Sequence, residues 1–147
     1  MKLTTKMRYG TRVMLELALH YERGPMSLSE IAERQQLSEK YIESLASILR
    51  SAGLLQSTRG SQGGYRLARP PEQITLRDIF EVLEGSEPFV PCTADPSACQ
   101  RGDWCVTQEV WARMYYASIR ILEATTLADL VTRSWEKQGQ AAVMYSI

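Results

Sequence analysis

Residues 27–68, which read SLSEIAERQQLSEKYIESLASILRSAGLLQSTRGSQGGYRLA, decide the fold of this chain. Ser27 and Glu30 form a capping-box pattern, in which side chains and backbone N–H groups at the start of a helix bond reciprocally. Ser38 predicts the cap of a second helix, which covers residues 39–52 and ends at a glycine. Two short helices joined by so tight a connection are typical of a helix-turn-helix.

A β-hairpin is predicted directly after these two helices. Leu54–Thr58 and Tyr65–Ala68 are strand-like runs separated by a short loop. Three glycines supply the positive backbone angles that a hairpin turn requires, and they are Gly60, Gly63 and Gly64. A hairpin after a helix-turn-helix indicates a winged helix, whose second helix enters the major groove while its wing lies along the minor groove of DNA.

Candidate DNA-binding residues lie at the start of the second helix and at the tip of the hairpin. On the helix these candidates are Ser38, Lys40, Tyr41, Glu43 and Ser44. On the hairpin they are Arg59, Gly60, Ser61 and Gln62. Lys40 suits a phosphate or guanine contact, and Glu43 could accept from a cytosine amino group. Each residue taken singly is equally consistent with a solvated surface position. Only the combination of the helix and the wing favours DNA binding.

The chain before and after this module predicts further helices. Apolar residues at helical spacing indicate a first helix from Met7 to Arg23, before Gly24 and Pro25. Thr75 is a plausible cap for a helix that runs to Gly85, with Asp78 completing the cap. A last helix is expected from Leu127 to Lys137 with Thr126 as its cap, and no structure is assigned to the tail, residues 140–147.

A long helix from near Cys105 to near Glu123 carries two neighbouring apolar stripes. One stripe contains Val106, Val110, Met114, Ala117 and Ile121, and the other contains Trp111, Tyr115, Ser118 and Leu122. A helix this broadly apolar needs two surfaces to pack against. We therefore expect one stripe to meet its own domain and the other to meet a second subunit, in a homodimer that matches a pseudo-palindromic DNA operator. The alternative is an ordinary core helix of a monomer.

Charge is distributed unevenly along the chain, although the formal net charge is zero. Residues 1–70 carry eleven Lys and Arg against six Asp and Glu, and residues 71–147 carry six against eleven. This asymmetry is expected when only the N-terminal part meets phosphate. No apolar run approaches the ~18 residues of a membrane helix, and the N-terminus lacks a signal-peptide pattern. The sequence thus predicts a cytoplasmic protein without membrane contact.

Residues 88–108, PFVPCTADPSACQRGDWCVTQ, contain all three cysteines of the chain. In a reducing compartment such a group favours metal binding or redox chemistry over structural disulfides. Cys92, Cys99 and Cys105 are separated by six and five residues, which are not the close pairs of a zinc site. Thiolates at wider intervals suit an iron–sulfur cluster, and a thiol switch without metal is the other interpretation.

Four stretches together carry a family resemblance over most of the chain. They are KLTTKMRYG (2–10), the helix-turn-helix and wing of residues 28–68, ITLRDIFEVLEG (74–85) and the three cysteines before a long helix. The chain resembles the Rrf-two family of winged-helix regulators, in particular its IscR-like and NsrR-like members. The resemblance implies a dimeric transcription factor that senses cluster status, receives its cluster from donor proteins, and reads DNA through the helix around Tyr41 and Glu43 and through Arg59.

The resemblance also implies that Cys92, Cys99 and Cys105 ligate the cluster, with 2Fe-2S favoured and 4Fe-4S possible. This chain departs from those relatives at the fourth ligand. Gln108 occupies the position where IscR-like members have a histidine, and Arg8 the position where NsrR-like members have an aspartate. The remaining candidates for a fourth ligand are Gln108 itself, Glu109, Asp95 and Asp103, besides solvent or a small thiol.

The expected fold is mainly α with a small β-hairpin, a winged helix-turn-helix followed by a long C-terminal dimerisation helix. We expect a DNA-binding domain over residues 1–85, a cluster-binding loop over residues 86–105, and dimerisation and C-terminal helices over residues 106–147. The expected function is redox-sensing or cluster-sensing transcription regulation, not enzymatic catalysis, since one histidine leaves little general-base chemistry. The alternatives are a cluster-free regulator controlled by thiol oxidation or a partner protein, and an iron–sulfur redox carrier.

Overall fold

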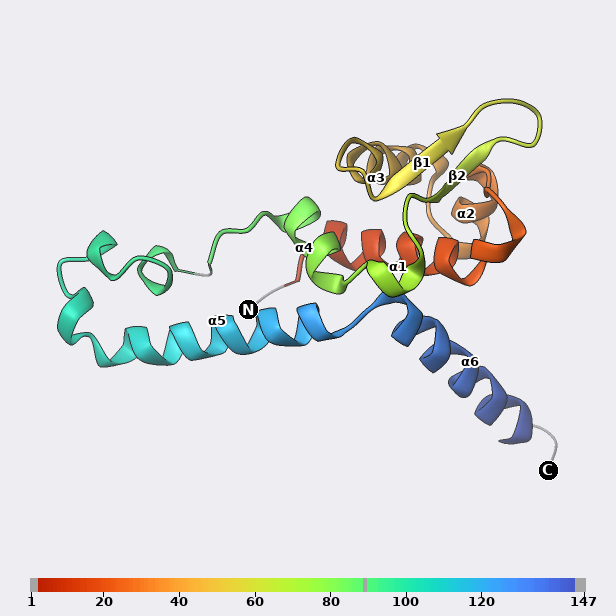
Figure 1. Ribbon diagram of the computed structural model, residues 1–147. Coiled ribbons are helices and arrows are strands. Elements are labelled where there is room, and N and C mark those ends of the chain that lie inside the picture. Colours follow the sequence, from red (N-terminus) through yellow and green to blue (C-terminus); the bar gives the residue numbers. More distant parts are fainter. Residues whose placement is uncertain (1–2, 89, 145–147) are drawn as a thin grey trace.

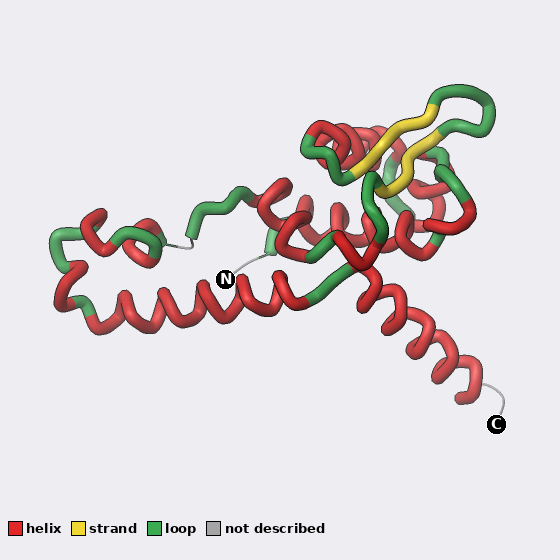
Figure 2. The backbone as a smooth tube through the Cα atoms, viewed as in Figure 1, coloured by secondary structure: helices red, strands yellow, loops and turns green. Residues whose placement is uncertain are grey.

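The computed structural model describes residues 3–88 and 90–144, apart from the side chains at 103, 142 and 143. Its described part is mainly helical and contains one small antiparallel hairpin, as the sequence predicts (Figures 1 and 2). The helices and strands are α1 (Thr5–Leu19), α2 (Leu28–Gln35), α3 (Glu39–Ser51), β1 (Leu55–Thr58), β2 (Gly64–Leu67), α4 (Leu76–Glu84), α5 (Val106–Ala124) and α6 (Leu127–Met144).

One hydrophobic core joins α1, α2, α3, α4, the hairpin and the first turns of α6. Its fully buried side chains include Val13, Met14, Ile31, Ile42, Ile79 and Leu127. Helices α1 and α4 come close together at Gly10, where an added Cβ would collide with the side chain of Leu83. The core thus fixes the helix-turn-helix on α1 and anchors the beginning of α6.

The helix-turn-helix has the caps that the sequence predicts. Ser27 and Glu30 form a reciprocal capping box at the start of α2, and the Ser38 hydroxyl accepts from the backbone N–H of Tyr41 at 3.3 Å. Between α2 and α3 the chain turns through Gln36, which takes a left-handed conformation with φ 53°. Both caps satisfy N–H groups that have no partner inside the helix, so the two helices have well-defined starts.

The wing pairs β1 with β2 in a register that runs from Leu55 opposite Leu67 to Thr58 opposite Gly64. Gly60 and Gly64 have positive φ angles of 110° and 153°, as expected. A positive φ was also expected for Gly63, and this prediction is wrong: Gly63 is not among the described glycines with a positive φ. Glycine is needed there for space, because a Cβ would collide with the carbonyl oxygen of Thr58.

Two helix ends differ from the sequence predictions. The first helix ends at Leu19 instead of Arg23, because His20 leaves helical geometry with φ −100° and ψ 3° and a separate 3-10 turn, η1 (Tyr21–Arg23), follows. The last helix continues to Met144 instead of Lys137, since Gly139 does not interrupt it. Its predicted cap is confirmed, because the Thr126 hydroxyl accepts from the N–H of Asp129 at 3.1 Å. Residues 145–147 of the tail lie outside the described residues.

Helix α5 lies against α4 and beneath the cysteine-containing segment (Figure 1). An ion pair between Arg77 and Glu123 joins the two helices, and the Tyr115 hydroxyl donates to the Ser86 carbonyl at 3.2 Å. None of the described side chains of α5 is buried. No described helix combines the length and the apolar character needed to cross a membrane.

Candidate nucleic-acid interface and cysteine loop

The start of α3 presents a polar surface formed by Ser38, Lys40, Glu43 and Ser44. All four residues are exposed, while Ile42, Leu45, Ala46 and Leu49 on the opposite side of the helix are buried in the core. The Ser38 hydroxyl is engaged in capping, so its contribution to this surface is mainly structural. Lys40, Glu43 and Ser44 are free to contact a groove, and their role there stays a prediction.

Tyr41 lies differently from its neighbours on α3. Its ring is half-buried and meets the ring of Tyr9 on α1 edge-on, with centroids 6.1 Å apart and planes at 90°. The guanidinium of Arg12 lies 5.2 Å from the centroid of Tyr9 on the same helix. Tyr41 therefore helps to fix α3 on α1 and was expected, from its position off the apolar face, to be more exposed than it is.

The tip of the wing is fully open to solvent. Arg59, Gly60, Ser61 and Gln62 are all exposed, and the hairpin projects from the body beyond α2 and α3 (Figure 1). Arg66 and Gln56 pair across the two strands at 3.2 Å. The wing can thus offer one arginine and three small or polar residues to DNA without rearranging the core.

A polar network between α1 and the end of α2 was not found from the sequence. Arg12 donates from Nε to the side-chain oxygen of Gln35 at 2.8 Å and from its terminal nitrogen to the Gln35 carbonyl at 3.1 Å. Gln35, which is buried, donates to Glu16 at 2.8 Å, and Glu16 pairs with Arg34 at 3.0 Å. The sequence pattern that could have indicated this network is the i, i+4 spacing of Arg12 and Glu16 on the polar face of α1.

The cysteine loop, residues 86–105, contains three single-turn 3-10 helices. They are η3 (Pro91–Thr93), η4 (Pro96–Ala98) and η5 (Gly102–Trp104). Pro91 and Pro96 open two of these turns, where the missing N–H of proline costs nothing and its fixed φ favours a turn. Thr93 is buried, and most of the other loop residues are exposed. The loop is therefore built from local turns with little apolar support.

All three thiols are free and belong to this loop or its end. Cys92 and Cys105 are half-buried and Cys99 is exposed. Cys105 is the N-terminal cap residue of α5, and its sulfur lies 3.2 Å from the Thr107 hydroxyl. The hydrogen bond with Thr107, followed by the backbone N–H of Gln108 and the charge of Arg101, lowers the pKa of Cys105. This environment favours the thiolate, the form that binds metals and attacks oxidants.

The described side chains contain no group of three or more His, Cys, Asp or Glu residues arranged to hold a metal ion. Gln108, a candidate fourth ligand, donates from its amide nitrogen to the Cys92 carbonyl at 2.9 Å. Glu109 is exposed in the first turn of α5, and Asp95 caps η4 by accepting from Ser97. The side chain of Asp103 lies outside the described part. The thiols thus have the right chemistry for an iron–sulfur cluster, but the loop would have to draw them together.

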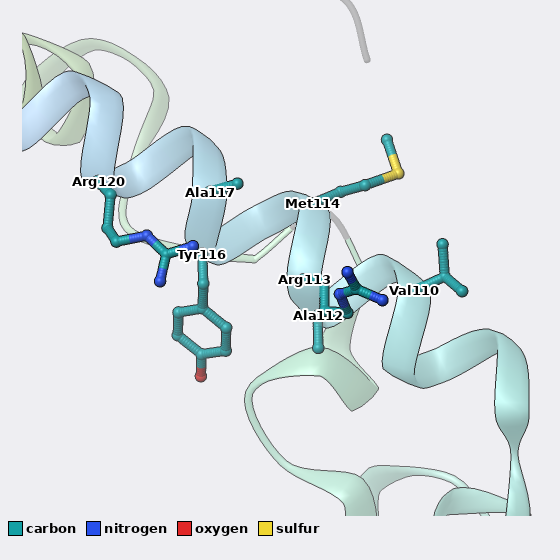
Figure 3. Close-up of a pocket in the computed structure, with 7 residues that line it drawn as sticks. All are labelled: Val110, Ala112, Arg113, Met114, Tyr116, Ala117 and Arg120. Carbon is teal, nitrogen blue, oxygen red and sulfur yellow. The ribbon is translucent and has the colours of Figure 1, made fainter.

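Helix α5 carries an open apolar surface on its solvent side. A shallow groove of about 740 Å³ runs along the helix and is lined by Val110, Ala112, Arg113, Met114, Tyr116, Ala117 and Arg120 (Figure 3). Ile121, further along the first predicted stripe, is 66% exposed. Contiguous exposed apolar surface of this kind usually marks an interaction site.

The helix-turn-helix, its wing and the exposed long helix define a winged-helix transcriptional regulator. The family model for Rrf2, described as an iron-dependent transcriptional regulator, matches residues 3–133. The chain belongs to the Rrf2 family. Its relatives are named as transcriptional regulators, so this protein is a regulator and not an enzyme.

Three relatives illustrate the range of this family. The chain is 44% identical over 131 residues to protein rrf2 of Nitratidesulfovibrio vulgaris, covering 89% of this chain and 87% of the relative. It is 43% identical to the regulator CymR of Bacillus subtilis over the whole of both chains. The solved structure of that protein, titled the global cysteine regulator, matches with a TM-score of 0.79, 42% identity and coverage of 90% and 98%. T. potens IscR matches with a TM-score of 0.78, 43% identity and coverage of 94% and 91%.

Proposed function

We propose that this protein is a homodimeric regulator that reads a pseudo-palindromic DNA operator and whose affinity responds to an iron–sulfur cluster held by Cys92, Cys99 and Cys105. One observation carries the proposal. The three free cysteines all lie in the segment that links α4, which packs in the core, to α5, which exposes its apolar surface. Any ligand that gathers the thiols therefore acts between the DNA-reading module and the dimer helix.

Several features support DNA reading by α3 and the wing. Lys40, Glu43 and Ser44 are exposed at the start of α3, and Arg59 is exposed at the tip of the wing. The first half of the chain carries the excess of positive charge. In this proposal residues 1–85 form the DNA-binding domain, and phosphate contacts provide most of the affinity while α3 provides base selection.

The exposed stripe of α5 supports a dimer. An isolated helix with Val110, Met114 and Ile121 open to water leaves apolar area that a second copy of the same helix would cover. A two-fold dimer would present two α3 helices to the DNA, as the two half-sites of a pseudo-palindromic operator require. Residues 106–147 then serve dimerisation, with the first turns of α6 also belonging to the core.

The cysteine loop of residues 86–105 supplies the sensing part of the proposal. Cys92 lies in η3, which contacts α5, and Cys105 occupies the N-cap position of α5. Ligation at both positions would tie the loop to the first turn of α5 and bias the position of α5 against α4. A 2Fe-2S cluster is favoured and 4Fe-4S is possible, with Gln108 or Glu109 as the fourth protein ligand.

The decisive experiment compares cluster content and operator affinity in the same preparations. The protein is purified without oxygen, analysed for iron and sulfide, and tested by gel shift against genomic fragments. We expect the wild type and the loop control Ser97→Ala to carry cluster, and the triple variant C92A/C99A/C105A to lack it while remaining folded and dimeric. Operator affinity should differ by about 5-fold to 150-fold between the two states. Equal affinity in loaded and empty protein would refute sensing by a cluster.

A second candidate function is regulation by thiol oxidation without a cluster. It is favoured by the lowered pKa of Cys105 and by the lack of an assembled three-ligand group among the described side chains. This candidate predicts full operator control in protein free of iron and sulfide, with affinity that changes on addition of peroxide. The variant Cys105→Ala alone would abolish that response.

A further inference from the structure

A groove on the side of the DNA-binding module has no role in the functions described above. It lies between the end of α1, α6 and the 3-10 turn η2 (Pro71–Gln73), and its volume is about 430 Å³. Pro71 and Val131 are buried where they line it, whereas Tyr21 and Trp135 are 36% and 61% exposed. Figure 1 shows α6 leaving the body on the side of α1 away from α3 and the wing. An occupant of this groove would leave the proposed DNA-reading surface free.

The charge of the groove is entirely negative. Among the described residues, Glu22 and Glu72 both line it, and no lysine or arginine does. Neither glutamate forms an ion pair or side-chain hydrogen bond with a residue of the described chain. Two carboxylates beside apolar surface repel each other and attract a cation. They also disfavour nucleic acid, whose phosphates carry the same sign.

The aromatic side chains of the groove indicate which kind of cation would bind there. Tyr21 and Trp135 are large, exposed aromatic residues that line the same groove as the two glutamates. A guanidinium is planar, stacks on aromatic rings, and bonds to carboxylates in a fork, whereas an ammonium is a compact and strongly hydrated charge. An arginine side chain also has an aliphatic stem that could cover Pro71 and Val131.

We propose that this groove binds an arginine side chain presented by a partner protein. The guanidinium lies between Glu22 and Glu72 and against Trp135. The proposal depends neither on a bound cluster nor on an operator, because none of the groove residues belongs to the cysteine loop, α3 or the wing. It places a second protein on a face of the module whose lining residues belong to neither α3 nor the wing, so that the partner and DNA contact different residues.

The test uses N-acetyl-argininamide as the probe, because it has the side chain of arginine within a protein and no free carboxylate. The protein is labelled with nitrogen-15, and the indole N–H signal of Trp135, assigned with the variant Trp135→Phe, is followed during titration. We expect a saturable shift with millimolar affinity. The uncharged N-acetyl-citrullinamide should cause no saturable shift, and N-acetyl-lysinamide and free arginine should bind more weakly.

Variants then connect the binding to the groove. We expect E22Q/E72Q to weaken binding of the probe by roughly tenfold. Glu33→Gln, which removes one exposed charge from α2 outside the groove, should leave binding of the probe unchanged. Each variant is checked for native melting behaviour, and the same titration in C92A/C99A/C105A should give the wild-type result. The proposal is overturned if argininamide gives no saturable shift, if citrullinamide or lysinamide binds equally well, or if E22Q/E72Q binds as the wild type does. It also fails if Trp135, measured as the difference between the wild type and Trp135→Phe, is already shielded from acrylamide quenching in the free protein, since the groove would then be covered without the probe.

Discussion

The winged-helix module and the region from the cysteine loop through α5 are built in opposite ways. The module buries Val13, Ile42 and Ile79 completely in one core. In contrast, α5 has no buried residue among its described side chains, and the loop before it is made of separate 3-10 turns. The first region determines its own shape, whereas the second exposes apolar surface and free thiols. We therefore expect the structure of the second region to depend more strongly on what it binds.

The largest expected effect concerns the stability of the module, which depends on its own buried core. Ile79→Ala should lower the free energy of unfolding by about 2–5 kcal/mol, because it truncates a fully buried core side chain of α4. Gln100→Ala in the exposed loop should change it by less than about 0.5 kcal/mol. Urea unfolding at a fixed protein concentration measures both values. Similar losses for the two variants would contradict the contrast between the regions.

The next effect concerns the exposed stripe of α5. Ile121→Glu should weaken the dimer by about 3 kcal/mol, because a carboxylate would be buried without a partner in the proposed interface. That corresponds to a roughly 150-fold rise in the dissociation constant, measured by analytical ultracentrifugation. Gln73→Glu adds the same charge at an exposed position of η2, outside the dimerisation segment, and serves as the control. An unchanged monomer–dimer equilibrium in Ile121→Glu would show that the stripe is not the dimer surface.

A smaller effect is expected at the wing. Arg59→Ala should weaken operator binding by about 1 kcal/mol and reduce the slope of log affinity against log salt by about 1, if its guanidinium contacts phosphate. The comparison variant is Arg133→Ala, whose arginine pairs with Glu136 on α6, away from the wing. Fluorescence anisotropy at several salt concentrations gives both slopes. Equal slopes for the wild type and Arg59→Ala would remove the wing from phosphate contact.

The smallest effect is the pH dependence at the start of α2. Hydrogen bonds from the backbone and hydroxyl of Ser27 lower the pKa of Glu30 below its ordinary 4.5. The stabilisation by ionised Glu30 is therefore complete above that value and is lost as the pH falls through the lower pKa of the folded state. Glu30→Gln should slightly lower stability at pH 7 and flatten the acid limb of the stability curve. Thermal melts between pH 2 and pH 7 can test this, with Glu33→Gln as the neighbouring control.

The features that the sequence predicts well are those with local causes. The capping boxes at Ser27 and Thr75 depend on residues three positions apart, and both are confirmed. The end of α1 was predicted too late, since Tyr21 continues the apolar spacing although the chain has already left the helix at His20. The extension of α6 to Met144 was missed because it needs no special residue, only the absence of a helix stop.

The candidate sites were predictable to a lesser extent. The exposure of Lys40 and Arg59 follows from their position opposite the apolar face and in a turn. The half-buried position of Tyr41 depends on Tyr9, which lies on another helix far along the chain, so no local pattern reveals it. The same holds for the contact of Arg12 with Gln35. Contacts between residues far apart in the sequence, such as these two, can be recognised only once the fold is known.

The hydrogen bond from Gln108 to the carbonyl of Cys92 has a consequence for the entropy of the cysteine loop. It joins two residues 16 positions apart, and η3 also packs on α5. Closing a flexible segment of that length costs about 2.5 kcal/mol of chain entropy before other contributions. Because the folded protein already holds the two ends together, a ligand of the three thiols does not have to overcome this cost again. The bond confines Cys92 and Cys105 to a smaller volume than an open loop would allow, which raises the effective concentration of these two thiols for one another.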